Sequence, residues 1–292
     1  MDHHERSLRS LPIWHGLLAI TPLKGGVSNA SFVVEDRTGK YVARIGHDYP
    51  FHQVSRAREA EAARAAHEIG LSPKLIYAAD GVMVVPFITA HTYGEADVRK
   101  NWQRCLEMIM RCHRDMARHI RGQGAIFWVF QILRDYAQNL RAGQHRCMSN
   151  LPKWMNVVDD LEKAQVPLPV IFGHHDLLPT NFMDDGARLW LIDWEYGAFG
   201  TAMFDLANMA TANSFAPELE VQMLANYFGG TPDLAKTRGY FAMKVAAALR
   251  EAMWGMVSEL HLSAPGVDYV AYAAEYTGRF EAIHARYKKD FL

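Results

Sequence analysis

The sequence is poor in cysteine, and its three cysteines, Cys105, Cys112 and Cys147, are odd in number and stand in no metal-ligand spacing. A disulfide framework is therefore not expected, and the composition suits the reducing cytoplasm. No run of about 18 uninterrupted apolar residues occurs, which predicts that the chain does not span a membrane. The polar residues 1–6 lack the apolar run of a signal peptide, so a cytoplasmic protein is expected.

Net charge is also nearly absent, at −1 for 292 residues. No global field therefore favours nucleic acid or an anionic membrane, although this net charge does not exclude a local acidic pocket for a cationic substrate. Half of the residues are hydrophobic, which gives a chain of this length enough material for a large core and for two lobes. The sequence shows no internal repeat and does not indicate an oligomeric state.

The first part of the chain alternates short apolar runs with turn residues. These runs predict strands at residues 18–20, 32–34, 41–45, 75–77 and 82–85. A segment rich in Ala, Glu and Arg predicts one main helix from Gln53 to Ile69, and from about Asp97 the chain is predicted to be mostly helical. We therefore expect an α+β protein with a small antiparallel-sheet lobe over residues 1–90 and a larger, mostly helical lobe over residues 91–292.

A cluster of polar residues follows a buried strand that is predicted at residues 169–172. Asp176 lies on the loop after this strand, and residues 181–192 predict a hairpin with its turn at 184–186. A hairpin brings its open ends together, so Asn181 and Asp193 are expected to lie side by side. Asp176 is within reach of the same site.

This arrangement suits phosphoryl transfer. Asp176 can receive the proton of an attacking hydroxyl, while the oxygens of Asn181 and Asp193 can bind Mg²⁺. Asp and Asn are also common turn residues, which is the simpler interpretation for any one of them. Turn propensity does not account for the occurrence of Asp176, Asn181 and Asp193 together in this order.

The pattern His-x-Asp-x-x-x-x-Asn over residues 174–181 and the run Ile-Asp-Trp-Glu-Tyr over residues 192–196 resemble the choline/ethanolamine kinase family, in its bacterial form. That family shares the bilobal fold of aminoglycoside phosphotransferases and protein kinases. The resemblance implies that ATP and Mg²⁺ are the cofactors, that Asp176 is the catalytic base and that His174 orders the loop. It also implies that Asn181 and Asp193 hold the metal and that Asp205 supports the loop without reacting.

The run Gly-Gly-Val-Ser-Asn at residues 25–29 lies between two predicted strands. Glycines let a backbone approach phosphates, although a Gly-Gly turn is also common in ordinary hairpins. The run lacks the G-x-G-x-x-G of protein kinases but resembles the loop of the choline kinase group. Residues 84–88 resemble the hinge, where the backbone of Phe87 and Ile88 would meet adenine. The resemblance implies that the loop residues in contact with ATP are Gly25, Gly26, Ser28 and Asn29.

Arg44 lies in the third predicted strand, at the place where protein kinases carry a phosphate-binding lysine. A cation in an apolar strand needs an anionic partner. Helical spacing puts Glu59 on the apolar face of the predicted helix. We therefore predict an ion pair between Arg44 and Glu59, with Glu61 as the alternative partner and an exposed Arg44 as the simpler interpretation.

The acceptor site is expected near Glu195, which follows the metal motif and can attract a substrate cation. Residues 243–257 predict a buried helix on which Glu251 and Trp254 face the same way. A carboxylate beside an indole suits a quaternary ammonium, which is attracted to π-faces. The run at residues 250–254 resembles bacterial members of the family. Further acceptor contacts are predicted at Trp194 and Tyr196.

Three tyrosines, Tyr269, Tyr272 and Tyr276, share one predicted helical face, which is either core or pocket wall.

Gly200 stands where eukaryotic choline kinases often have Asn, and residues 210–213 lack the acidic run of those kinases. The second difference leaves the identity of the acceptor open.

The sequence thus predicts a kinase that transfers the γ-phosphoryl group of ATP to choline, ethanolamine or a similar amino alcohol. One alternative is a kinase of the same fold for an aminoglycoside, thiamine or another hydroxylated metabolite. The other is a catalytically silent nucleotide- or amino-alcohol-binding module.

Overall fold

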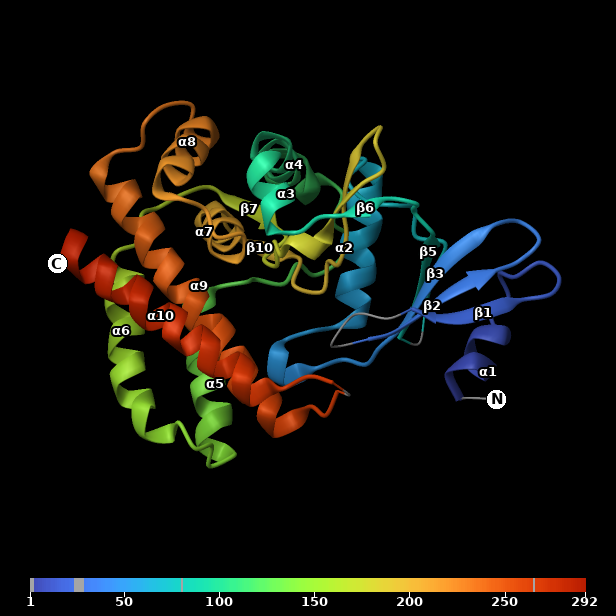
Figure 1. The fold of residues 1–292 in the computed structure, drawn as a ribbon, viewed down its shortest axis with the longest axis horizontal. Coiled ribbons are helices and arrows are strands. Elements are labelled where there is room, and N and C mark those ends of the chain that lie inside the picture. The colour runs from blue at the N-terminus through green and yellow to red at the C-terminus, as the bar shows by residue number, and fades with distance from the viewer. Residues whose placement is uncertain (1–2, 24–28, 80, 265) are drawn as a thin grey trace.

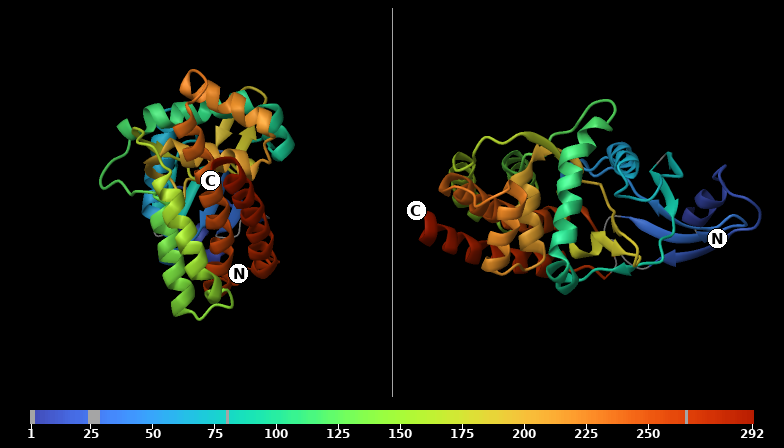
Figure 2. Two further views of the ribbon diagram at one scale, coloured as in Figure 1. Left: turned by 90° about the vertical axis from the view of Figure 1, so that its left-hand side faces the viewer. Right: turned by 90° about the horizontal axis from the view of Figure 1, so that it is seen from above.

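The computed structural model describes residues 3–23, 29–79, 81–264 and 266–292. A β-sheet with the N-terminus lies at one end of the molecule, and long helices with the C-terminus lie at the other (Figure 1). The view from above shows the same division along the long axis (Figure 2). The predicted α+β architecture, with a small sheet region and a larger helical region, is confirmed.

Within the described residues, the N-terminal sheet has five strands in the order β1-β2-β3-β5-β4, and every neighbouring pair is antiparallel. A short helix, α1 (His3–Arg9), packs against it. The alternation of apolar side chains places the strands as predicted, with shifts of one or two residues at their ends. The strands are β1 (Ala19–Leu23), β2 (Ala30–Glu35), β3 (Lys40–Ile45), β4 (Tyr77–Ala79) and β5 (Val82–Pro86).

One face of this sheet forms a small core with α1. Leu8 of α1 is fully buried in it, together with Phe32, Val34, Ala43, Val82 and Val84. Successive side chains of a strand point to opposite faces. Because Ala43 faces α1, its neighbour Arg44 faces the other side of the sheet, toward the rest of the molecule.

The main helix of this region, α2 (Arg56–Glu68), begins three residues later than predicted. Residues 50–52 form a short 3₁₀ helix, η1 (Pro50–His52), before α2. The amide of Tyr49 donates to the carbonyl of Val54 at 3.0 Å, and this hydrogen bond closes the loop that contains η1. The buried alanines of α2 belong to the larger core of the helical region. The chain division near residue 90 therefore stays a prediction.

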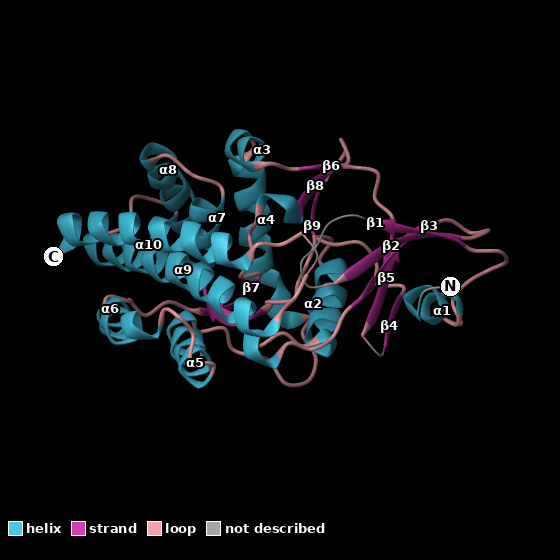
Figure 3. Cartoon of the chain, turned by 60° about the horizontal axis from the view of Figure 1, so that its bottom comes forward, coloured by secondary structure: helices cyan, strands magenta, loops and turns pink. Residues whose placement is uncertain are grey.

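The helical region is built around α9 (Leu234–His261), which packs against α5, α6, α7 and α10. Figure 3 shows these helices gathered on one side of the molecule and most strands on the other. Among the described residues, no helix is both long and apolar enough to cross a bilayer. The remaining helices are α3 (Glu95–Lys100), α4 (Trp102–Asp115), η2 (Met116–Arg118), α5 (Val129–Ala142), η3 (Met148–Asn150), α6 (Leu151–Lys163), α7 (Ala202–Ala212), α8 (Pro217–Phe228) and α10 (Tyr269–Phe291).

Short strands interrupt the helical region where the polar cluster was predicted. The predicted buried strand is β7 (Val170–Gly173), which pairs with β10 (Ala198–Thr201). The predicted hairpin is confirmed as β8 (Phe182–Asp184) and β9 (Leu189–Leu191), and β6 (His91–Thr92) extends it. Its first polar residue, Asn181, ends a 3₁₀ turn, η4 (Pro179–Asn181), just before β8.

Candidate active site

The loop that follows β7 is held by a buried carboxylate. The backbone amides of His174 and His175 donate to Asp205 of α7 at 2.9 and 2.7 Å, and His113 lies 2.9 Å from the same carboxylate. Burial acts to raise the pKa of Asp205, but the neighbouring histidines and these hydrogen bonds hold it well below 3.8. The interpretation of Asp205 as a support for the loop is confirmed.

Replacement of Asp205 by Asn should lower the free energy of unfolding by about 3 kcal/mol, because an amide cannot accept from both loop amides. Since the pKa of Asp205 is lowered in the folded state, its contribution is complete above the ordinary value of 3.8 and is lost as the pH falls through the lowered pKa. Urea unfolding from pH 7 to pH 3 should therefore show a constant difference between wild type and variant that shrinks below about pH 4.

A matched control is Asp160→Asn, since Asp160 is exposed and pairs with Lys163 on the surface of α6. It should change the free energy of unfolding by less than about 0.5 kcal/mol. An Asp205→Asn protein as stable as this control would contradict the assigned support.

His174 links the two halves of the site. Its Nε2 lies 2.9 Å from the carbonyl oxygen of Ile192, and its Nδ1 accepts from the amide of Asp176 at 3.3 Å. Burial lowers its pKa, so the ring is neutral with the proton on Nε2. The predicted ordering role of His174 is consistent with both contacts.

The sequence pattern predicts no role for His175. Its backbone is left-handed, with φ +63°, and its ring is stacked on Phe127 at 4.2 Å. Burial lowers its pKa to about 4. A Cβ at Gly200 would lie 3.0 Å from His175 Nε2, so the glycine at this position makes room for the ring. No signal in the sequence besides its place next to His174 could have identified it.

Asp176 and Asn181 are brought together as predicted. The side-chain nitrogen of Asn181 donates to the backbone oxygen of Asp176 at 2.8 Å and to its carboxylate at 3.2 Å. Burial raises the pKa of Asp176 well above 3.8, Glu251 raises it further, and Arg250 opposes the shift. A carboxylate with a raised pKa is suited to accepting a proton near neutral pH.

Asp193 follows β9 with a left-handed backbone, φ +68°. The amide of Ile192 donates to the carbonyl of Asn181 at 3.0 Å, which joins the open ends of the hairpin as expected. Asp193 binds Arg44 at 3.0 Å through one oxygen and is 29% exposed, so the carboxylate remains accessible. Backbone strain of this kind is typical of functional positions.

The donor set of Asn181 and Asp193 fits a magnesium ion. The amide nitrogen of Asn181 is engaged by Asp176, which leaves its carbonyl oxygen for a metal. In the part of the chain that the structure describes, no group of three or more His, Cys, Asp and Glu side chains can hold an ion. Mg²⁺ commonly binds through one or two protein oxygens, phosphate oxygens and water, so two protein ligands suffice. The metal roles of Asn181 and Asp193 stay predictions.

The predicted ion pair between Arg44 and Glu59 is present, with 3.0 Å between the charged atoms, and Glu59 is 3% exposed. The alternative partner, Glu61, pairs instead with Arg64 on the outer side of α2. A Cβ at Gly197 would lie 3.1 Å from Cβ of Ala62, so glycine there lets α2 approach the loop that carries Asp193.

A second arginine extends this network. Arg56 binds Glu59 at 2.6 Å and Glu195 at 3.1 Å. Burial and the charge of Asp193 raise the pKa of Glu195 to about 7. Because Glu195 is paired with Arg56, its predicted contact with a substrate cation gains no support from this position.

The nucleotide side of the site is described in part. Asn29 and Arg44 line a cavity of about 290 Å³ between the sheet and α2. At the predicted hinge, the amide of Phe87 donates to the carbonyl of Lys40 at 2.9 Å, so this N–H is not available to adenine. The contacts of Phe87 and Ile88 with adenine stay predictions. The predicted phosphate contacts Gly25, Gly26 and Ser28 lie outside the described residues.

On the acceptor side, Glu251 forms an ion pair with Arg250 and accepts from the hydroxyl of Tyr272 at 2.8 Å. The indole nitrogen of Trp254 donates to the hydroxyl of Tyr196 at 3.0 Å, and its ring meets Tyr272 edge-on at 5.5 Å. Tyr196, Trp254 and Tyr272 therefore form an aromatic cluster, which contacts Glu251 through Tyr272.

The remaining candidates divide between this cluster and the core. Tyr276 is half-buried and its ring lies 4.5 Å from that of Tyr272, whereas Tyr269 is buried. Trp194 is also buried, at 2% exposure, and its indole donates to Ser72 at 2.7 Å. This places Trp194 in the core, so a direct contact with an acceptor gains no support.

A two-lobed fold, with the half-buried carboxylate of Asp176 on a loop and an arginine–glutamate pair bound to Asp193, defines a phosphotransferase of the protein-kinase-like class. The chain belongs to the phosphotransferase enzyme family, whose model matches residues 19–240. The predicted bilobal fold and the prediction of a phosphotransferase are confirmed.

Relatives and solved structures agree with this assignment. A probable ethanolamine kinase of Arabidopsis thaliana is 25% identical over 295 residues, covering 88% of this chain and 77% of the relative. A choline/ethanolamine kinase family protein from Mesorhizobium loti is 25% identical with a TM-score of 0.76, over 97% of this chain and 94% of that one. The choline kinase LicA from Streptococcus pneumoniae is 22% identical with a TM-score of 0.80, over 98% and 100%. The predicted resemblance to choline/ethanolamine kinases is confirmed.

Proposed function

We propose that the protein is an ATP- and Mg²⁺-dependent kinase that phosphorylates the hydroxyl of choline, ethanolamine or a similar amino alcohol. The observation that carries this proposal is the contact of Glu251 with the aromatic cluster, through the hydroxyl of Tyr272 at 2.8 Å. Burial raises the pKa of Asp176, and the charge of Glu251 raises it further. We infer that the two carboxylates face one site, so that a cation held at Glu251 presents an attached hydroxyl to Asp176.

The aromatic cluster suits a compact cation. Trp254 and Tyr272 present π-systems, which attract an ammonium whether or not it carries N–H groups. The carboxylate of Glu251 adds charge, and its ion pair with Arg250 keeps it in place. A short amino alcohol has one cation and one hydroxyl a few bonds apart, which matches one carboxylate beside one base.

In the proposed reaction, the oxygen of the acceptor hydroxyl attacks the γ-phosphorus of ATP and its proton passes to Asp176. The bond between the γ-phosphorus and the oxygen that bridges it to the β-phosphate breaks, and ADP leaves. Asn181 holds the carboxylate of Asp176 by a hydrogen bond of 3.2 Å, which fixes its direction. Arg44, held by Glu59 and Asp193, provides positive charge for phosphate oxygens. Solved LicA in complex with AMP supports nucleotide binding in a protein of this fold.

The proposal includes two metal ligands. Asn181 and Asp193 would hold Mg²⁺, which supplies charge neutralisation for the phosphates when it is bound. The ion pair of Asp193 with Arg44 supports this proposal, because it joins the loop that carries Asp193 to the sheet.

The aminoglycoside alternative is less well supported by the acceptor side. Aminoglycosides carry many ammonium groups and call for several carboxylates, whereas the proposed acceptor site combines the carboxylate of Glu251 with an aromatic cluster, which suits one compact cation. A silent binding module is also disfavoured, because Asp176, Asn181 and Asp193 are all retained. Thiamine is an aromatic cation with a hydroxyl, and a comparison of turnover with thiamine and with amino alcohols distinguishes these acceptors.

Replacement of Trp254 by Ala tests the acceptor assignment. The KM for choline should rise by about 2- to 30-fold, the effect of losing a cation–π contact, and the KM for ethanolamine should rise less because its ammonium can still donate hydrogen bonds to Glu251. Steady-state kinetics with both acceptors would measure this. Trp190→Ala is the control, since Trp190 contacts Arg188 and Asp185 on the hairpin. Equal KM values in wild type and Trp254→Ala would place Trp254 outside the acceptor site.

A further inference from the structure

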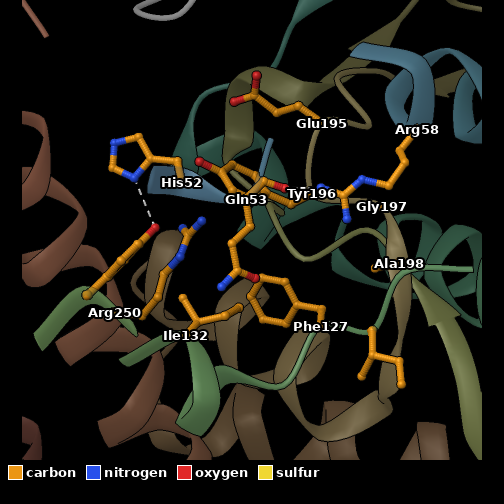
Figure 4. A pocket seen from close by; sticks show the side chains of 12 residues that line it. His52, Gln53, Arg58, Phe127, Ile132, Glu195, Tyr196, Gly197, Ala198 and Arg250 are labelled. Atoms are coloured by element: carbon orange, nitrogen blue, oxygen red, sulfur yellow. Dashed lines mark hydrogen bonds between the residues drawn. The ribbon is translucent and has the colours of Figure 1, made fainter. Parts of the chain in front are cut away.

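His52 is a buried histidine that the proposed reaction does not use. It ends η1, in the connection between β3 and α2, and is 3% exposed. Figure 4 shows its ring close to Arg250, with a hydrogen bond running from the ring to a neighbouring hydroxyl. The hydrogen-bond partners of its ring, Tyr136 and Ser258, belong to the helical region, so a segment from the sheet side reaches into the acceptor side.

Both ring nitrogens of His52 are engaged. Nδ1 lies 3.1 Å from the hydroxyl of Tyr136 on α5, and Nε2 lies 2.9 Å from the hydroxyl of Ser258 on α9. Two hydrogen bonds to buried partners on two helices prevent the ring from rotating. The imidazole plane is therefore fixed relative to α9.

The fixed imidazole is stacked on Trp254. The two rings lie 5.0 Å apart between centroids, with an angle of 18° between their planes. The indole nitrogen is held by Tyr196, and Tyr272 meets the ring edge-on. Because one face of the indole is covered by His52, only the opposite face can receive a cation.

We propose that His52 is a positioning residue that sets the plane of the Trp254 indole and so determines which face receives the ammonium group of the acceptor. The inference rests on the proposed function, in which Trp254 contacts the acceptor. It assigns a role in acceptor binding to a residue of the connection between β3 and α2.

The charge state of His52 is compatible with this role. Burial, followed by the charges of Arg250 and His261, lowers its pKa well below 6.5, so the ring is neutral. A protonated imidazole behind the indole would repel an ammonium on the other face, whereas a neutral ring leaves the π-face attractive.

A double-mutant cycle tests the proposal, with His52→Ala, Trp254→Ala and the double variant. His52→Ala should raise the KM for choline by about 2- to 30-fold and leave the KM for ATP within about twofold, because the indole loses its support. The KM for choline of the double variant should equal that of Trp254→Ala alone, since His52 acts only through the indole. His52→Phe, which keeps a stacked ring without the two hydrogen bonds, should raise the KM for choline less than His52→Ala does.

The control is His145→Ala. His145 is also buried and also contacts α9, through Glu259 at 3.0 Å, but it has no contact with Trp254. It should leave the KM for choline within about twofold of wild type. Thermal unfolding of every variant identifies loss of fold, and if His52→Ala does not fold, the same cycle is run with His52→Phe.

The outcomes separate this inference from the proposed function. If Trp254→Ala raises the KM for choline and the His52 variants do not, the positioning role is overturned and the proposed function stands. If the effects of His52 and Trp254 on KM add, His52 acts elsewhere and the role is again overturned. If the wild type phosphorylates no amino alcohol, the proposed function fails and the inference fails with it.

Discussion

Replacing Asp176 with Asn should lower kcat by about 10²- to 10⁴-fold, the usual contribution of a general base. The amide has the same shape and can still contact Asn181, so the loop should keep its structure. It cannot take the proton of the acceptor hydroxyl. The Kd of ATP should stay within about threefold of wild type, because loss of the base does not remove a phosphate contact.

Steady-state kinetics and calorimetric titration with ATP measure the two parts of this prediction. Asp160→Asn on the surface of α6 is the control and should leave both kcat and the Kd of ATP unchanged. Turnover near that of wild type in the Asp176→Asn protein would remove Asp176 as the base.

Replacing Asp193 with Asn should lower kcat/KM by about 10²-fold or more, since metal-held charge stabilises the transferring phosphoryl group by several kcal/mol. The Mg²⁺ concentration that gives half-maximal rate should rise as well. Asn is chosen because Asp193 has φ +68°, a conformation that Asn tolerates and most other residues do not. The side-chain oxygen of Asn at this position can still accept the hydrogen bond from Arg44, so the substitution removes the negative charge and keeps the contact.

A magnesium titration of the initial rate provides the measurement. Asp184→Asn at the closed end of the same hairpin is the control, because Asp184 contacts Arg104 and Tyr93 away from the site. It should leave the magnesium requirement unchanged. An Asp193→Asn protein with the magnesium dependence of wild type would contradict the ligand role.

The elements that depend on local pattern were predictable from the sequence. The hairpin that joins Asn181 to Asp193 follows from a turn between two apolar runs. The partner of Arg44 follows from helical periodicity, which separates the inward Glu59 from the outward Glu61. In both cases, the contact is determined by a repeat of two or 3.6 residues.

Contacts between distant segments were not predictable in the same way. Glu195 was interpreted as a substrate contact because it follows the metal motif, but the structure pairs it with Arg56 of α2. Trp194 was placed with it, and its ring is buried against Ser72 instead. Both residues lie after the end of β9, in irregular structure and a turn, where no repeat of two or 3.6 residues indicates which side chain faces the core.

The stack of His52 on Trp254 is the clearest example. His52 lies in a 3₁₀ turn between a strand and a helix, where no periodic pattern predicts which way a side chain points. Its partners on α5 and α9 are set by the packing of the whole helical region. Only the three-dimensional arrangement connects this residue with the acceptor side.

The central claim is that the protein phosphorylates a small amino alcohol, and an ATP-consumption assay over a panel of acceptors tests it most directly. The panel contains choline, ethanolamine, thiamine and aminoglycosides, with magnesium present and with Asp176→Asn as the low-activity control. We predict saturable turnover with choline or ethanolamine and a phosphorylated product visible by phosphorus NMR. Turnover with an aminoglycoside or thiamine and none with either amino alcohol would contradict the claim.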